Sequence, residues 1–206
     1  MKRRLVLAAL SLAALLPACS ILPEREAVDV YLLPGAIDHA AAPAGPQIDV
    51  SLRVLRPVSG SRIAGRRIVV IPDDRLVSVY QGAAWTDPAP VLMRERIVDA
   101  LLAGQRFASV STDERSLFAD FELDTELRAF QSEYRNGRPE AVIRIDVRLA
   151  QGNTRHIVAG QRFEARERAA GTAVADVVDA MGRAADRIAL EIARWSAGHA
   201  SQIPPR

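Results

Sequence analysis

The chain has 206 residues, of which 49% are hydrophobic and 25% charged, so it is long enough for one domain with a sizeable core. Its 27 basic residues nearly balance its 25 acidic ones, which argues against a nucleic-acid partner, because such binding needs a concentrated basic face. The only cysteine is Cys19, which excludes an internal disulfide, and the only lysine is Lys2, so a chain that loses its first residues has no lysine chemistry.

The first 20 residues have the organisation of a secretory signal peptide. Basic residues at 2–4 precede an apolar run at 5–16 that is too short to span a bilayer as a retained helix. The run ends in Leu16-Pro17-Ala18-Cys19, which resembles a lipobox, so we expect residues 1–18 to be removed and Cys19 to carry lipid. The alternative is an ordinary signal peptide followed by an unmodified cysteine.

The residues after the cysteine predict where the protein resides. By similarity to bacterial lipoproteins, Ser20 favours the periplasmic face of the outer membrane, where an aspartate would favour the inner membrane. Residues 19–27 form a tether that reaches no more than ~30 Å when fully extended. We therefore expect the folded domain to lie close to the lipid.

Four short strands are predicted before residue 81. They cover residues 28–33, 48–54, 67–71 and 76–80. Residues 34–47 are rich in Pro, Ala and Gly and predict an exposed loop. Pro72-Asp73-Asp74 is a turn sequence, so the third and fourth strands are expected to be neighbours.

From Asp87 the apolar period changes from two to about 3.6, which predicts a helix that ends at Gly104. Its apolar stripe consists of Val91, Ile97, Val98, Leu101 and Leu102. The charged residues Arg94, Glu95, Arg96 and Asp99 fall outside this stripe. We expect these four side chains to be exposed.

Three strands with cleaner alternation follow, at 121–129, 141–149 and 157–165. Asn136-Gly137 is a strong turn signal, although the connection at 131–139 is longer than a two-residue hairpin. These strands predict an antiparallel meander with one buried and one solvated face.

The longest periodic segment runs from Val174 to Trp195 and predicts a helix of about 25 residues, with Thr172 as its cap. Together the elements predict an α+β fold in which two amphipathic helices pack on one face of a largely antiparallel or mixed sheet. We expect a single domain at 28–198 and a C-terminal tail at 199–206.

Several short motifs in a fixed order suggest a family. They are Tyr31-Leu32-Leu33-Pro34, Leu55-Arg56-Pro57-Val58, Arg67-Ile68-Val69-Val70, Val79-Tyr80 followed by Trp85, and Trp195 in the last helix. From Cys19 to Ala197 the chain thereby resembles the ABC-type transport auxiliary lipoproteins, the PqiC-like outer-membrane partners of MCE lipid-transport systems.

This resemblance implies a non-catalytic subunit, held at the membrane by its lipid, that docks on an MCE-domain transport protein. It further implies help in moving phospholipids or other apolar molecules between membranes, with a lipid as a possible ligand, and we expect a homo-oligomer. Of the family's functional residues only the lipidated cysteine maps onto this chain, at Cys19. The alternative is a structural or assembly lipoprotein of the envelope without a transport role.

Catalytic motifs are incomplete. Residues 60–65 have the glycine spacing of a phosphate-binding loop, but Arg66 and Arg67 stand where Lys and Ser/Thr are required. The histidines, His39, His156 and His199, are scattered and offer no metal two ligands on one helical face. Asp73-Asp74 suits a turn better than an acid–base pair. The sequence predicts neither an enzyme nor a cofactor or metal site.

Two aromatic residues have a functional interpretation that competes with a structural one. Tyr80 and Trp85 flank the small residues 81–84, which are expected to form a loop that presents the aromatics to a partner or a lipid. Alternatively, Tyr80 ends a strand and Trp85 packs over the first helix. Charges on the solvated sheet face are either hydrated or paired between copies in a ring, and the sequence leaves both possibilities open.

Overall fold

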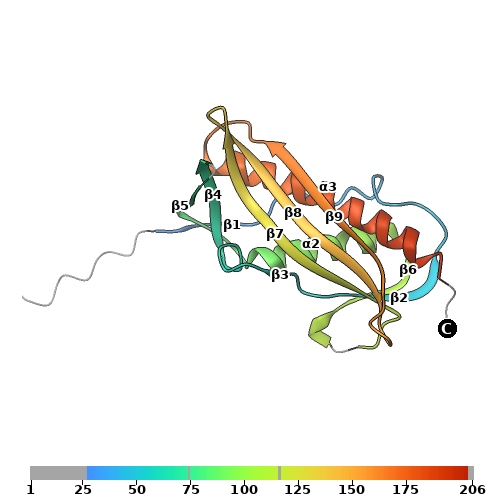
Figure 1. Cartoon of the computed structure of the whole chain (residues 1–206). Helices are drawn as coiled ribbons and strands as arrows, with labels where there is room; N and C mark the ends of the chain where they lie inside the picture. The colour runs from blue at the N-terminus through green and yellow to red at the C-terminus, as the bar shows by residue number, and fades with distance from the viewer. Residues whose placement is uncertain (1–26, 74, 116, 204–206) are drawn as a thin grey trace, which may run out of the picture.

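The structure is a computed structural model that describes residues 27–73, 75–115 and 117–203. The predicted signal peptide, Cys19, Ser20 and most of the tether lie outside these residues. In the described part, two long helices pack on one face of a nine-stranded mixed sheet (Figure 1). The predicted α+β class is confirmed.

The elements keep the order that the sequence predicts, with additions. The strands are β1 (Asp29–Tyr31), β2 (Ile48–Val54), β3 (Val58–Ser59), β4 (Arg67–Asp73), β5 (Leu76–Trp85), β6 (Phe107–Thr112), β7 (Phe121–Arg135), β8 (Arg138–Gln151) and β9 (Ile157–Arg168), and the helices are α2 (Ala89–Gly104), the 3₁₀ turn η1 (Asp113–Arg115) and α3 (Val174–Ala200).

The sheet is organised around β7, its longest strand. One edge of β7 pairs antiparallel with β8, which pairs antiparallel with β9. The other edge pairs parallel with β2, β3 and β4 in turn. Because β6 extends β2, whereas β5 and β1 extend β4, the sheet has a β2–β6 end and a β4–β5–β1 end on this side.

The meander β7–β8–β9 confirms the three predicted strands and lengthens each of them. Phe121, Leu123, Thr125, Leu127 and Ala129 are all buried, as the alternation requires. The connection after β7 is shorter than predicted, because Asn136 and Gly137 alone form the turn, with φ of 51° and 74°. Two consecutive positive φ angles match the right-handed twist of a hairpin, and Asn-Gly adopts them at little cost.

Strand β6 was not predicted. Its sequence, Phe-Ala-Ser-Val-Ser-Thr, is mostly small and polar, and its second and third residues are exposed, so it has no clear alternation. The strand forms because it pairs in parallel with β2, which lies more than 50 residues earlier in the chain. A single-sequence pattern carries no information about such a distant partner.

Helix α3 supplies much of the core. Its buried stripe confirms the predicted period and includes Val177, Val178, Met181, Ala184, Ala185, Ile188 and Ile192. The predicted cap at Thr172 is wrong, because Ala173 is the N-cap and makes no side-chain hydrogen bond. The helix continues to Ala200, so His199 lies within it and not after it. Neither α2 nor α3 is long and apolar enough to cross a membrane.

The predicted exposure of the charged residues in α2 is partly wrong. Arg94 and Arg96 are buried, with exposed fractions of 3% and 7%, whereas Leu102 of the predicted stripe is 53% exposed. Helix α2 packs against both α3 and the β2–β6 part of the sheet, so its buried surface is wider than one apolar stripe. Carboxylates from other elements pair with the two guanidinium groups, which permits their burial.

The loop at 34–47 is not simply exposed, because Ile37 and Pro43 are buried. At its start, Pro34 passes so close to α3 that a Cβ on Gly182 would overlap its carbonyl oxygen. This close approach explains a glycine in the middle of a helix, where it costs about 1 kcal/mol relative to alanine.

We predict that Gly182→Ala lowers the free energy of unfolding by about 1–3 kcal/mol, because the new methyl group displaces the Pro34 segment. Gly198→Ala is the matched control, since nothing lies within 4 Å of its Cβ position in the same helix. That change leaves stability unchanged or raises it by up to about 1 kcal/mol. Urea unfolding measures both variants, and equal midpoints would contradict the close approach.

Candidate functional site

The described chain begins at the β4–β5–β1 end of the sheet, so the predicted anchor would join the domain there. Strand β1 pairs parallel with the end of β5, with Val30 opposite Ala84 and Tyr31 opposite Trp85. The Ala27 carbonyl oxygen lies 3.8 Å from the Cβ position of Gly82 in β5. Ala27, the first described residue, therefore lies beside β5.

Trp85 is a core residue. It has no exposed surface, and its ring meets Phe130 edge-on, with centroids 5.7 Å apart and an interplanar angle of 71°. A contact with a partner would require the fold to open, so the structure agrees with the core alternative for Trp85. Trp85 is the last residue of β5, because this strand continues through residues 81–84 instead of ending at Tyr80. Its position in the sheet explains why Trp85 is buried.

The expected loop at 81–84 is a bulge within β5. Arg67 pairs with Ala84, but Val69 pairs with Val79, so β5 holds extra residues between the two pairs. Gly82 has a φ of 67°, a conformation that glycine adopts without strain. The bulge changes the facing of β5 and turns Trp85 toward the core.

Tyr80 is only partly buried. Its hydroxyl donates to Ser132 Oγ at 3.3 Å, and burial raises the pKa of Tyr80 to about 12. The tyrosine therefore stays neutral and polar at physiological pH. Its role as a partner or lipid contact stays a prediction.

Arg96 joins three parts of the chain. Its Nη2 donates to the carbonyl oxygens of Leu33 and Pro34, both at 3.0 Å, and its Nη1 donates to Asp186 of α3. Burial raises the pKa of Asp186 above its ordinary value, although Arg96 opposes this shift. The segment that follows β1 is thus fixed to both helices through one guanidinium group.

Arg94 serves a similar purpose at the opposite side of α2. Its Nη1 lies 3.0 Å from Asp113, and its Nη2 lies 2.7 Å from both Glu114 and Glu95. Burial alone would lower the pKa of Arg94, but the three carboxylates raise it above its ordinary value. The pairs fix η1 against α2.

The outer face of the meander, opposite the helices, is covered by ion pairs within the chain. Asp146 accepts hydrogen bonds from Arg162 at 2.6 Å and from Arg128 at 2.9 Å. Arg166 bridges Glu164 and Glu133, at 2.9 and 2.8 Å. The charges are therefore paired across neighbouring strands of one molecule, which neither sequence-based alternative anticipated.

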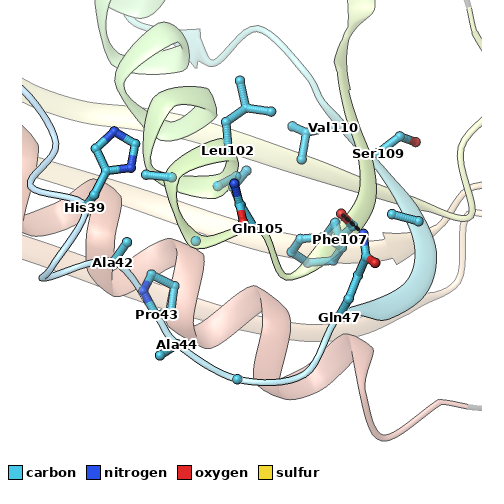
Figure 2. Close-up of a pocket in the computed structure, with 15 residues that line it drawn as sticks. His39, Ala42, Pro43, Ala44, Gln47, Leu102, Gln105, Phe107, Ser109 and Val110 are labelled. Carbon is cyan, nitrogen blue, oxygen red and sulfur yellow. Dashed lines mark hydrogen bonds between the residues drawn. The ribbon is translucent and has the colours of Figure 1, made fainter.

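A hollow of about 680 Å³ lies at the other end of the molecule, between the 39–47 loop, the end of α2 and β6 (Figure 2). It is lined by His39, Pro43, Gln47, Leu102, Gln105 and Phe107, among others. Its lining is mostly small or apolar, and its polar groups do not converge on one point. The hollow does not have the arrangement of a catalytic site.

The histidines do not come together. His39 lies in the hollow's loop, His156 in the β8–β9 turn, and His199 in α3, where its Nδ1 lies 2.9 Å from the Trp195 carbonyl oxygen. Within residues 27–73, 75–115 and 117–203, no group of three or more His, Cys, Asp or Glu side chains is placed to bind a metal ion. Trp195 packs edge-on against Phe163, with ring centroids 5.9 Å apart.

Comparison with known families identifies the class of protein. The family model for the ABC-type transport auxiliary lipoprotein component matches residues 31–193, and the chain belongs to this family. The match starts at Tyr31, the first residue of the motif that Arg96 fixes. No functionally curated protein matches the sequence.

Solved structures share the fold. Protein XCC0632 from Xanthomonas campestris is 25% identical, with a TM-score of 0.76 over 84% of this chain and 98% of its own. An uncharacterised protein is 17% identical, with a TM-score of 0.63 over 82% of this chain and 99% of its own. The hypothetical protein CT253 from Chlamydia trachomatis is 10% identical, with a TM-score of 0.54 over 76% and 100%. The last two show a common fold alone.

We predict that Arg96→Ala lowers the free energy of unfolding by about 2–4 kcal/mol, because it removes a buried guanidinium and leaves the partly buried Asp186 without its cation. Arg194→Ala is the matched control, since this exposed arginine of α3 donates only to the Ala41 carbonyl oxygen. The control should change stability by less than about 1 kcal/mol. Equal denaturation curves for the two variants would show that the Arg96 contacts contribute little.

We predict a loss of stability in acid that depends on Asp146, whose two arginines lower its pKa from 3.8 to about 2. A carboxylate with a lowered pKa stabilises the fold fully above its unfolded pKa, and this contribution is lost as the pH falls from 3.8 toward 2. Asp146→Asn should flatten that part of the stability–pH curve, measured by urea unfolding. Asp49→Asn, at an exposed position in β2, should leave the curve unchanged.

Proposed function

We propose that this chain is a lipid-anchored, non-catalytic auxiliary subunit of an MCE-type ABC transport system. The subunit is anchored through Cys19 at the periplasmic face of the outer membrane and helps to move phospholipids or other apolar molecules between the two membranes. The family match over residues 31–193 carries the proposal.

Two features of the described domain support a non-catalytic role. The charged side chains described above on the outer face of β7–β9 are paired with one another, so they do not form a reactive cluster. The most perturbed acidic group, Asp146, has its pKa lowered by two arginines, which makes it a poor proton carrier near neutral pH. The domain instead offers surfaces for partners and a fixed point for a lipid anchor.

The anchor is tested by palmitate labelling and membrane fractionation of the unsubstituted chain and of Cys19→Ala. We expect label and membrane association in the first and neither in the second, because one thiol would carry the diacylglycerol. Ser20→Ala is the matched control and should keep both. Ser20→Asp should keep the lipid but move the protein to the inner membrane. Equal membrane association of Cys19→Ala would overturn the anchor.

The transport role is tested by crosslinking the intact lipoprotein in membranes and identifying its partners by mass spectrometry. Recovery of an MCE-domain protein supports the proposal, whereas recovery of outer-membrane barrel or secretion components alone supports a structural role. A photo-crosslinking residue at Tyr80 should capture the partner, and one at Arg155, in the β8–β9 turn, should not. Capture of copies of this chain would support the expected homo-oligomer.

A further inference from the structure

The charged side chains on the outer face of the sheet are arranged differently at β7–β9 and at β4–β5–β1. On β7–β9 the arginines pair with carboxylates, as described above. At the β4–β5–β1 end, Arg67 of β4 lies close to Arg62 and Arg66 of the preceding loop and to the exposed Val77 of β5. Among the described residues, none of these three guanidinium groups lies within 4.0 Å of a carboxylate.

The three arginines line one hollow of about 560 Å³. The other lining residues are Ser61, Gly65, Val69, Val77, Ser78 and Val79, so no acidic side chain is among them. Arg62 donates to the Arg128 carbonyl oxygen and Arg66 to the Trp85 carbonyl oxygen, both at 2.8 Å. These bonds position the side chains without neutralising their charge.

Two acidic groups lie close by, and one of them is paired with an arginine. A neighbouring hollow shares Arg62 and contains Asp73 and Glu133. Glu133 accepts a hydrogen bond from Arg166 at 2.8 Å, which offsets its charge. Asp73 accepts the backbone N–H groups of Arg75 and Leu76 and keeps its charge, so one carboxylate in the neighbouring hollow stands against three guanidinium groups. The three arginines therefore retain a local excess of positive charge.

Exposed apolar side chains lie on and directly beside the same strands, and are here called the apolar row. Val30 pairs with Ala84, which pairs with Arg67, and directly paired residues point to the same side of a sheet. Val30 is 54% exposed, Val77 is 53% exposed, and Leu32 is 72% exposed. Val28, two residues before Val30, is exposed as well. These apolar side chains and the three arginines are together called the anchor-side surface.

The anchor-side surface lies at the end of the domain that is nearest to the predicted lipid anchor. Figure 1 places β1, β4 and β5 together at the end of the molecule where the described chain begins. Only seven residues separate Cys19 from Ala27, and such a segment reaches no more than ~30 Å. A bilayer that holds the lipid of Cys19 therefore lies within reach of the anchor-side surface.

We propose that the anchor-side surface binds the anchoring bilayer itself, with Arg62, Arg66 and Arg67 on the phosphate groups of anionic phospholipids and the apolar row against the acyl-chain boundary. This inference rests on the proposed anchor. Arginine side chains reach phosphates from an apolar surface because their stems are apolar and their heads donate several hydrogen bonds. The contact fixes the orientation of the domain and turns the β2–β6 end away from the membrane.

The first test separates the surface from the anchor. The chain from residue 19 onward, carrying Cys19→Ala, keeps every described residue and is floated with phosphatidylcholine vesicles, with and without phosphatidylglycerol. We expect binding only to the anionic vesicles and loss of that binding at high salt. Because each arginine near a membrane contributes about fivefold in partitioning, Arg62→Gln with Arg67→Gln should weaken binding about 30-fold.

The matched control carries Arg115→Gln with Arg155→Gln, two exposed arginines outside the anchor-side surface. It should bind as the parent does, and circular dichroism should show that both double variants fold. Equal binding of both double variants would overturn the proposal. The proposal would also be overturned if inorganic phosphate released the protein from the vesicles and the protein bound phosphate as well as it binds anionic vesicles. That result would identify a soluble anion as the ligand. Neither result depends on whether Cys19 is acylated or an MCE-domain partner exists.

The second test locates the apolar contact. Leu32→Trp places a fluorophore on the anchor-side surface, and Phe118→Trp places one just before β7, ten or more residues from the part of β7 that pairs with β4. Anionic vesicles should shift the emission of Leu32→Trp to the blue and leave that of Phe118→Trp unchanged. A shift of Phe118→Trp alone would show that the opposite end faces the bilayer.

Discussion

The guanidinium of Arg96 is the contact on which the arrangement of the remaining elements depends. It joins the segment after β1 to α2 and, through Asp186, to α3. A buried cation is costly unless every donor has a partner, so Arg96 specifies one position for each of the three segments. The close passage of Pro34 over Gly182 reinforces that position. As a result β1 lies against β5, and the chain enters the fold at the β4–β5–β1 end.

The outer face of the sheet shows how one architecture supports two kinds of surface. On β7–β9, acidic and basic residues alternate across strands. Because these charges are paired, they exert only a weak electrostatic attraction on an external charged ligand. At the β4–β5–β1 end, carbonyl oxygens hold Arg62 and Arg66, and no described carboxylate lies within 4.0 Å of these two guanidinium groups or that of Arg67. The chain belongs to the family of ABC-type transport auxiliary lipoprotein components.

Secondary structure and burial were predicted correctly where a local sequence pattern determines them. The prediction failed where contacts with a segment distant in the sequence determine them. The meander and α3 were predictable because their apolar residues recur at periods of two and 3.6 over many residues. Strand β6 was not, because its small polar residues form a strand only beside β2. The burial of Arg94 and Arg96 was not predictable either, since the carboxylates of Asp113, Glu114 and Asp186 come from other elements. Of the residues singled out as contacts, Trp85 belongs to the core because a bulge at Gly82 changes its facing.

The sequence by itself determined the fold class, the order of nearly all strands and helices, the similarity to the auxiliary lipoproteins and the absence of a complete catalytic motif, because each of these is written in local composition and spacing. The tertiary structure alone decided which charges are paired and which are left without a carboxylate. Residues 60–67 show the difference. In the sequence they are an imperfect phosphate loop, whereas in the fold their arginines gather beside β5. The β4–β5 and β1–β5 pairs place Arg67, Ala84 and Val30 in one row across the sheet, although Val30 and Ala84 are 54 residues apart.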